Sequence, residues 1–287
     1  MAKIAVRFEC DENTGIRPPR SRELASGYGW TVSDVVCQAG PQNQPFEEQH
    51  SFTTVAVVVG GSFQYRSSTG CEMMTPGSML LGNAGDCFCC GHEHGTGDRC
   101  VSFVFTSEFL NRVVEIAGPG GPRFDVPRIP PIRAAAPLVA KASALLAGDR
   151  SVSGEELSVQ VATQAAEIVR LLDPHKARAD TSALSRVTRV IRMIDHDPHA
   201  PQVLSCLARV AGLSPHHFLR TFEGVTGTTP HQYILRARLR RAAIRLKMEK
   251  TKILDIALDC GFGDVSNFNR AFRTEFGINP RRYRSTA

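Results

Sequence analysis

The sequence predicts a multidomain α+β protein in which a small β-barrel domain, a helical segment and an all-α C-terminal domain follow one another. Three observations support this prediction. Short runs of β-branched residues separated by glycine and proline occupy residues 30–105, and apolar residues at helical spacing fill residues 183–287. Basic residues are concentrated in the same C-terminal part. With 287 residues, the chain is long enough for two ordinary domains with complete cores.

Charge is divided unevenly along the chain. Residues 183–287 contain 18 Lys and Arg against 8 Asp and Glu, a net charge of +10, whereas the first 182 residues contain 16 against 20, a net charge of −4. A basic module joined to a mildly acidic one indicates one half that binds a polyanion and another half with a different task.

The composition also bears on the cellular compartment. No apolar run approaches the roughly 20 residues that cross a membrane, and the first residues lack the apolar core of a signal peptide. The nine cysteines are an odd number, and Cys87, Cys89 and Cys90 are too close together for a disulfide framework. We therefore expect reduced thiols, a cytoplasmic location and no membrane partner.

Residues 1–125 are expected to form the β-rich domain. Residues 52–59 are rich in β-branched side chains, Gly60-Gly61 is typical of a turn, and residues 62–66 can pair back as a hairpin. Further short strands follow up to residue 105. Many short strands joined by Gly and Pro turns are typical of a small barrel or sandwich.

A helical segment is expected at residues 126–182. It overlaps a run dense in Gly and Pro and contains helices near residues 134–147 and 155–172. The second helix carries an apolar stripe formed by Leu157, Val161, Ala165, Ile168 and Leu172. This stripe can pack against the β-rich domain or across a homodimer. Residues 173–182 are polar and are typical of a linker.

The C-terminal domain, residues 183–287, contains one pattern twice. The repeated residues are Phe218, Arg220, Phe222, Gly227, Pro230 and Tyr233, which recur fifty positions later as Phe268, Arg270, Phe272, Gly277, Pro280 and Tyr283. Six matches at one offset indicate a duplicated supersecondary unit. A long helix from residue 230 to about residue 247 joins the two copies.

Each copy predicts a helix-turn-helix. A short apolar helix ends at Gly212 or Gly261, where a left-handed residue is favoured. A second helix then begins at an N-cap, Ser214 or Asp264. In this arrangement the second helix enters the major groove of DNA.

This region resembles the DNA-binding domain of the AraC/XylS family of bacterial transcription regulators. The residues that carry the resemblance are Leu207-Ala208, Gly212-Leu213-Ser214-Pro215, Phe218-Leu219-Arg220-Thr221-Phe222, Thr229-Pro230, Arg238-Leu239, Asp255-Ile256-Ala257, Cys260-Gly261-Phe262, Asn267-Phe268, Arg270-Ala271-Phe272 and Phe276-Gly277-Ile278-Asn279-Pro280. The resemblance implies binding to double-stranded DNA, a homodimer and, for an activator, contact with RNA polymerase.

The residues expected to face DNA lie outside the buried aromatic positions of the two second helices. They are His216, Leu219 and Arg220 in the first copy, and Val265, Ser266, Asn267, Asn269 and Arg270 in the second. Arginine can bridge guanine O6 and N7, and asparagine can pair with adenine. Alternatively, Arg220 and Arg270 are solvated or pair with Glu223 and Asp264. The arginines of the joining helix are expected to divide between ion pairs and phosphate contacts.

The N-terminal order of strands, Gly-Gly turn, Pro76-Gly77-Ser78 and His92-Glu93-His94 resembles the cupin-like sensory domain often found in AraC-type regulators. This resemblance implies a small-molecule effector bound inside the barrel. In a strand, Cys90, His92 and His94 share one face with Phe88 because side chains alternate. We expect these three residues and His50 to line the effector site.

The same residues, Cys90, His92 and His94, are also candidate ligands of a zinc or iron ion, with His50 as a further candidate. A thiol and imidazoles converging in a barrel are suited to either metal. The alternatives are a redox-sensing cysteine cluster and small core side chains without a ligand.

The leading interpretation is a transcription regulator, not an enzyme, controlled by a small-molecule, thiol or metal signal in its N-terminal domain. The alternative is a metal-dependent cupin enzyme fused to a DNA-binding domain. That enzyme would require a three-ligand metal site with open positions, and no complete cupin metal motif is present in the sequence.

Overall fold

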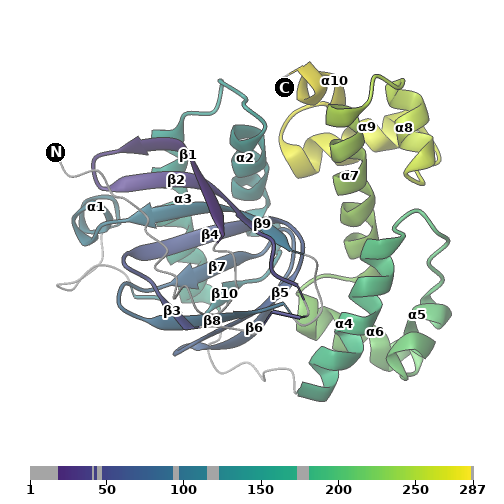
Figure 1. The fold of residues 1–287 in the computed structure, drawn as a ribbon, viewed down its shortest axis with the longest axis horizontal. Coiled ribbons are helices and arrows are strands. Elements are labelled where there is room, and N and C mark those ends of the chain that lie inside the picture. The colour runs from purple at the N-terminus through teal and green to yellow at the C-terminus, as the bar shows by residue number, and fades with distance from the viewer. Residues whose placement is uncertain are drawn as a thin grey trace. The chain divides into compact units, whose positions relative to one another are not determined.

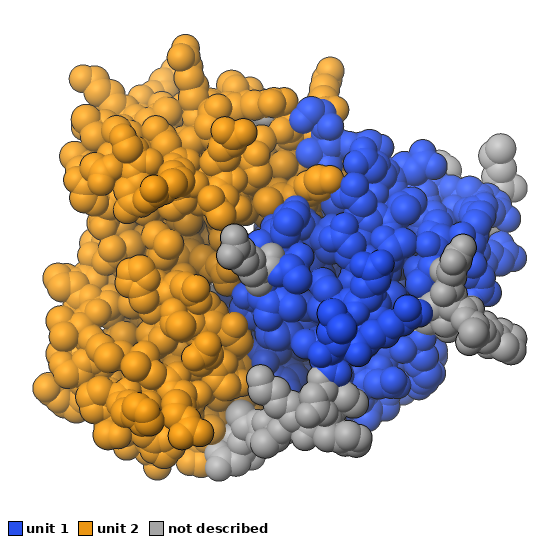
Figure 2. Space-filling model, turned by 180° about the vertical axis from the view of Figure 1, so that it is seen from behind, with its two compact units in different colours: residues 1–138, 151–178 blue, residues 139–150, 179–287 orange. Residues whose placement is uncertain are grey.

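The computed structural model describes residues 19–40, 42–43, 47–92, 97–114, 123–172 and 181–285. The chain divides into two compact units (Figure 2). Unit 1 comprises Met1–Leu138 and Ser151–Arg178, and unit 2 comprises Val139–Arg150 and Ala179–Ala287. The helical segment expected at residues 126–182 is thus shared between the two units.

Unit 1 is built on short antiparallel strands (Figure 1). The strands are β1 (Arg20–Gly27), β2 (Trp30–Cys37), β3 (Glu47–Gln49), β4 (Thr53–Gly60), β5 (Phe63–Ser67), β6 (Gly70–Met74), β7 (Met79–Gly82), β8 (Cys87–Gly91), β9 (Asp98–Phe105) and β10 (Arg128–Ile129). They form two sheets, with the orders β1-β2-β9-β4-β7-β10 and β3-β8-β5-β6. The β-rich prediction is confirmed. Within the described residues these sheets do not close into one barrel, so the cupin-like barrel stays a prediction.

The hairpin expected across Gly60-Gly61 is wrong. Both edges of β4 are occupied, by β9 and β7, so β5 pairs instead with β6 and β8 in the other sheet. Gly61 has a φ of 73°, and a β-carbon there would collide with the backbone of Gly97 and Asp98. A glycine is therefore required where the chain crosses between the sheets.

One apolar core lies between the two sheets. Its buried members come from both sheets and are Ala56, Val58, Phe63, Tyr65, Met74, Leu80 and Cys100. Inner faces of stacked sheets are apolar because every second side chain points inward. Phe88 and Cys90 of β8 pack against this core. The side of β8 that faces inward is therefore the side predicted from strand alternation.

The helices of unit 1 are α1 (Ser107–Val113), the 3-10 turn η1 (Arg133–Ala135) and α3 (Gly154–Leu171), and α2 (Ala136–Leu146) passes from unit 1 into unit 2. α3 packs on β1, β2 and β4. Leu157, Val161 and Ala165 of its apolar stripe are almost completely buried in this packing. These three residues are therefore used within unit 1 and are not open to a second copy of the chain.

Unit 2 is helical and contains two helix-turn-helix pairs, α5–α6 and α8–α9, joined by α7 (Figure 1). Its helices are α4 (Thr181–His196), α5 (Leu204–Ala211), α6 (Pro215–Thr226), α7 (Pro230–Met248), α8 (Ile253–Asp259), α9 (Val265–Phe276) and α10 (Pro280–Ser285). The duplication read from the sequence is therefore confirmed.

The predicted helix ends are also confirmed. Gly212 ends α5 at a φ of 65°, and Gly261 follows the C-cap residue of α8, Cys260, at a φ of 85°. The Ser214 hydroxyl accepts a hydrogen bond from the His217 N–H at 3.4 Å, and the Asp264 carboxylate accepts one from the Asn267 N–H at 2.7 Å. These caps satisfy backbone donors that have no partner inside the helix.

Among the helices of the described part of the chain, none is long and apolar enough to cross a membrane.

Candidate functional site

α6 and α9 each have one packed face and one open face. Phe218 and Phe222 in α6, and Phe268 and Phe272 in α9, are completely buried, because residues four apart lie on the same side of a helix. Of the residues expected to face DNA, Val265 is half-buried and the others are exposed: His216, Leu219, Arg220, Ser266, Asn267, Asn269 and Arg270. The fold thus leaves them accessible on the side opposite the aromatic core. Their contacts with DNA stay a prediction.

The two equivalent arginines keep hydrogen-bond donors for a ligand. Within the described residues, Arg220 makes no hydrogen bond or ion pair. Arg270 donates from Nη2 to Asn267 Oδ1 at 3.2 Å, one turn back along α9. Asp264 caps α9 and does not pair with Arg270. Each guanidinium therefore has donors left for a phosphate or a guanine edge.

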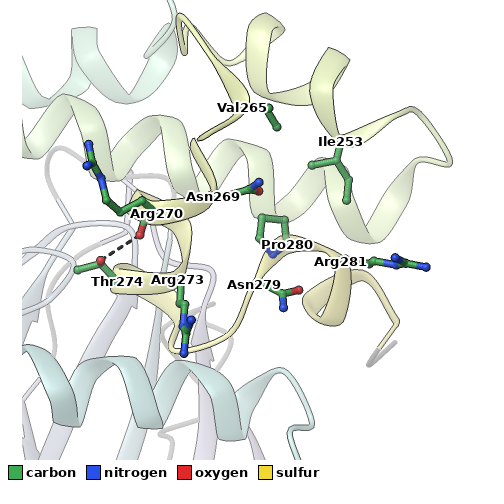
Figure 3. Close-up of a pocket in the computed structure, with 9 residues that line it drawn as sticks. All are labelled: Ile253, Val265, Asn269, Arg270, Arg273, Thr274, Asn279, Pro280 and Arg281. Carbon is green, nitrogen blue, oxygen red and sulfur yellow. Dashed lines mark hydrogen bonds between the residues drawn. The ribbon is translucent and has the colours of Figure 1, made fainter. Parts of the chain in front are cut away.

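A groove of about 930 Å³ lies beside α9 in unit 2 (Figure 3). It is lined by Ile253, Val265, Asn269, Arg270, Arg273, Thr274, Asn279, Pro280 and Arg281. Three of these residues are arginines and none is acidic, so the lining has a net positive charge, which favours anions such as DNA phosphate nearby. Figure 3 shows the guanidinium groups of Arg270 and Arg273 pointing in different directions, so the two can contact different phosphates.

Arg273 and Arg281 are not among the residues that the sequence predicts to face DNA. Arg273 comes three residues after Arg270, and this spacing places both on one side of a helix. Helical spacing could therefore have indicated Arg273. Arg281 lies on α10, and only the packing of α10 beside α9 brings it to the groove.

Most arginines of the joining helix α7 are structural. Arg236 pairs with Glu275 at 3.3 Å, and Arg240 pairs with Asp195 at 3.3 Å. Arg238 donates to the carbonyl oxygens of Pro198 at 2.8 Å and Gly261 at 2.9 Å, and thereby joins the loop after α4 to the turn of the second helix-turn-helix. These bonds fix α7 between the two pairs. Of the two roles expected from the sequence, ion pairs are present at Arg236 and Arg240, and phosphate contacts stay a prediction.

His50 lies buried in unit 1. Its Nε2 is 2.9 Å from Tyr65 Oη, and its ring stacks on Phe88 at a centroid distance of 4.1 Å. Tyr65 Oη already donates to the carbonyl of Leu81, so His50 Nε2 is the donor to Tyr65. Burial lowers the pKa of His50 to about 4, although the charge of Asp86 opposes this. His50 is therefore a neutral imidazole at neutral pH.

His92 is also buried, but its surroundings are charged. Its Nε2 is 2.7 Å from Asp98 Oδ2, and its ring stacks on Phe63. Burial opposes protonation, but the hydrogen bonds to Asp98 and Cys37 outweigh it and raise the pKa of His92 to about 9. His92 and Phe88 lie four positions apart along an extended chain, roughly 13 Å. His50, which stacks on Phe88, and His92 thus occupy different places in unit 1.

The thiols of the cysteine run in β8 have raised pKa values. Burial raises the pKa of the Cys90 thiol well above its usual value and raises that of Cys89. A hydrogen bond to Glu47 raises the pKa of Cys87. Reactive cysteines have lowered pKa values, so these observations do not favour the redox-sensing alternative.

The predicted metal set of Cys90, His92 and His94 is not tested, because His94 lies outside the described residues. Among the described residues, the side chains that come together with His92 are Cys37 and Asp98, with one ligand atom from each within 4.8 Å of the others. The sequence alone does not connect Cys37 with Asp98, because they lie far apart in the chain. Only their pairing across β2 and β9 brings them together.

Comparisons with known proteins identify relatives of this chain. Residues 207–286 match the model of a helix-turn-helix domain. The transcriptional activator NphR of Rhodococcus sp is 30% identical over 289 residues, which cover 96% of this chain and 76% of that protein. The regulatory protein SoxS of Salmonella typhimurium is 35% identical over 98 residues, or 34% of this chain and 92% of that protein. A crystal structure of a regulator with an AraC-type DNA-binding domain from Chromobacterium violaceum is 28% identical, with a TM-score of 0.35, over 37% of this chain and 95% of that one.

Two helix-turn-helix pairs, each with an exposed face and an exposed arginine on its second helix, are typical of a transcription regulator with a DNA-binding domain. The alignment with the Rhodococcus activator extends along 96% of this chain and so includes the β-rich unit. The chain belongs to the AraC family of transcriptional regulators.

Proposed function

We propose that the protein recognises specific duplex DNA sites through the exposed faces of α6 and α9. The observation that carries this proposal is the equivalent placement of Arg220 and Arg270. Each lies on the open side of a helix whose other side is anchored by two buried phenylalanines. Because α7 is fixed to neighbouring elements by Arg236, Arg238 and Arg240, the two helices can read adjacent segments of one duplex.

The test is selection of DNA sites from a random library by the full-length protein, followed by anisotropy titrations with the selected site and with scrambled DNA. A specific regulator binds the selected site roughly 10³-fold or more tightly than scrambled DNA. Equal affinities for both duplexes would overturn sequence recognition. Both affinities should fall steeply with salt, because lysine and arginine displace counterions from phosphate.

We further propose that unit 1 is a cupin-like sensory domain that receives a small-molecule signal, with an effector site that His50 and His92 line at different places, together with Cys90 and His94. Support comes from the interior position of His50, Cys90 and His92 in a β-rich unit. The relatives described above are named as regulators, which favours a sensor over the alternative metal-dependent enzyme. A compound library screened by thermal shift identifies the effector. Loss of the shift in His92→Gln supports the assignment, and a full shift in that variant contradicts it.

We also propose that the protein acts as a homodimer and activates transcription by contacting RNA polymerase. The Rhodococcus relative is named as an activator. Because the α3 stripe is buried within unit 1, dimerisation requires another surface. Analytical ultracentrifugation and in vitro transcription from the selected site test the two parts separately. A monomer at micromolar concentration excludes the dimer, and reduced transcription excludes activation.

A further inference from the structure

Three side chains of different chemistry meet at one end of the strands of unit 1. Cys37 is the last residue of β2, Asp98 is the first residue of β9, and the two lie directly opposite each other in the six-stranded sheet. His92 follows the end of β8, which belongs to the four-stranded sheet. One ligand atom from each residue lies within 4.8 Å of the other two. We propose that Cys37, His92 and Asp98 bind a zinc ion and thereby join the two sheets.

The donor set selects the class of ion. A thiolate, an imidazole and a carboxylate are ligands that zinc accepts together, whereas magnesium and calcium require oxygen donors. Tetrahedral zinc with bonds of 2.0–2.3 Å holds its ligand atoms roughly 3.3–3.8 Å apart. The hydrogen bond between His92 Nε2 and Asp98 Oδ2, at 2.7 Å, must therefore open by about 1 Å or less, which a side-chain rotation achieves.

The surroundings orient these ligands. The side chains of His92 and Asp98 are each 7% exposed, and the His92 ring stacks on Phe63. The Cys100 thiol lies 3.7 Å from Asp98 Oδ1, which is the carboxylate oxygen that does not contact His92. Such outer contacts fix the direction of metal ligands. Cys37 is only half-buried, so an ion can enter from its side.

The backbone also brings the strands close at this point. Gly97 has a φ of 93°, and a β-carbon there would come within 2.5 Å of the Cys37 carbonyl oxygen. Only glycine therefore allows the chain to enter β9 directly beside the end of β2.

Three protein ligands leave the fourth position of a tetrahedral ion for water or a small exogenous ligand. The proposed ion is thus placed where a second molecule can reach it.

This ligand set differs from the one that strand alternation predicts. Cys90 packs against the apolar core between the sheets. In the group of His92, Asp98 and Cys37, the thiol is supplied by Cys37 and not by Cys90. The difference can be tested, because the two sets share only His92. Metal binding is also independent of DNA recognition, so either proposal can fail alone.

The experiment uses full-length protein stripped of metal by a chelator and then titrated with cobalt(II) and zinc. We expect one ion per chain, a thiolate-to-cobalt charge-transfer band and tetrahedral d–d bands, and displacement of cobalt by zinc. Cys37→Ser and Asp98→Asn should weaken binding by more than about tenfold, since even loss of an outer contact costs 10–100-fold. Cys206→Ser, at an exposed thiol of unit 2, should bind as the parent does.

A second measurement needs no variant. Zinc should slow alkylation of Cys37 in the parent protein, as followed by mass spectrometry, and should leave the rate at Cys206 unchanged. Equal alkylation of Cys37 with and without zinc overturns the proposal. Full cobalt binding by folded Cys37→Ser does so as well, and loss of binding in Cys90→Ser alone would restore the set predicted from the sequence.

Discussion

Asp149 Oδ1 accepts a hydrogen bond from Arg282 Nη2 at 2.7 Å, and this ion pair ties the segment Val139–Arg150 to α10 within unit 2. The Asp149 side chain is 2% exposed. Close by, Gly277 ends α9 at a φ of 75°, and a β-carbon there would lie 2.9 Å from the carbonyl oxygen of Ala140. The second helix-turn-helix is therefore completed by residues that precede α3 in the chain.

Arg282→Ala is expected to destabilise unit 2 by about 1–2 kcal/mol. A hydrogen bond between two charged groups contributes somewhat more than this to the free energy of unfolding. Because the Arg282 side chain is half-exposed, solvent screens part of that contribution. Urea denaturation followed by circular dichroism measures the loss. The neighbouring exposed Arg281, which lines the α9 groove, provides the matched control. Arg281→Ala should keep the stability of the parent and weaken DNA binding. Equal stability of both variants would show that the Asp149 contact contributes nothing.

Arg270→Ala should cost roughly 1–3 kcal/mol of binding free energy on the selected site and relax the preference at one base pair. The reason is that its guanidinium lies on the open side of α9, with one contact to Asn267. Arg220→Ala should have the same effect at a different position, through α6. Anisotropy titrations against single-base variants of the site measure both. Equal losses on selected and scrambled DNA would show that these arginines contact only phosphate.

The stability of unit 1 should fall as the pH is lowered from about 6.5 towards 4. In the unfolded chain the His50 imidazole takes up a proton near its ordinary pKa of 6.5. In the folded protein it takes up the proton only near its lowered pKa of about 4. The unfolded state thus binds more protons in this window, and the full loss is on the order of 3 kcal/mol. The pKa of His92 is raised, so His92 makes its full contribution to the stability of unit 1 below pH 6.5. It loses this contribution only as the pH rises through about 9. It therefore does not mask the effect.

Thermal denaturation between pH 7 and pH 4.5 tests this prediction against His50→Gln. The variant should be less stable than the parent at pH 7, because it loses the stacking on Phe88, but its stability should change less with pH. The same slope in both proteins would assign the acid sensitivity to other groups.

Val161→Asp should unfold unit 1, because Val161 is completely buried where α3 packs on the six-stranded sheet. An unpaired carboxylate there costs several kcal/mol. Leu171, at the end of the same helix, is 87% exposed, so Leu171→Glu should leave the stability unchanged. Chemical denaturation distinguishes the two variants. A folded Val161→Asp protein that has only lost self-association would show instead that the stripe is a dimer interface.

Much of unit 2 could be predicted from the sequence because its signals are local. The caps at Ser214 and Asp264 and the left-handed glycines Gly212 and Gly261 act within a few residues of their own position. Phenylalanines four apart fix which side of α6 and α9 is buried, and so which side is open. For the candidate DNA interface, helical spacing predicted which positions are exposed, and the structure confirms that exposure for all but the half-buried Val265. Contacts of these positions with DNA stay a prediction.

What the tertiary structure decided is the set of partners that lie far apart in the chain. Strand patterning indicates that residues 63–67 are extended, but it does not choose between the sheets. The occupied edges of β4 made that choice. Likewise, the sequence shows His92 beside Cys90, whereas the pairing of β2 with β9 brings Cys37 and Asp98 to it. Alternation along one strand reports which side a residue faces. Only the register between strands, fixed by hydrogen bonds and by the shared core, determines what it meets there.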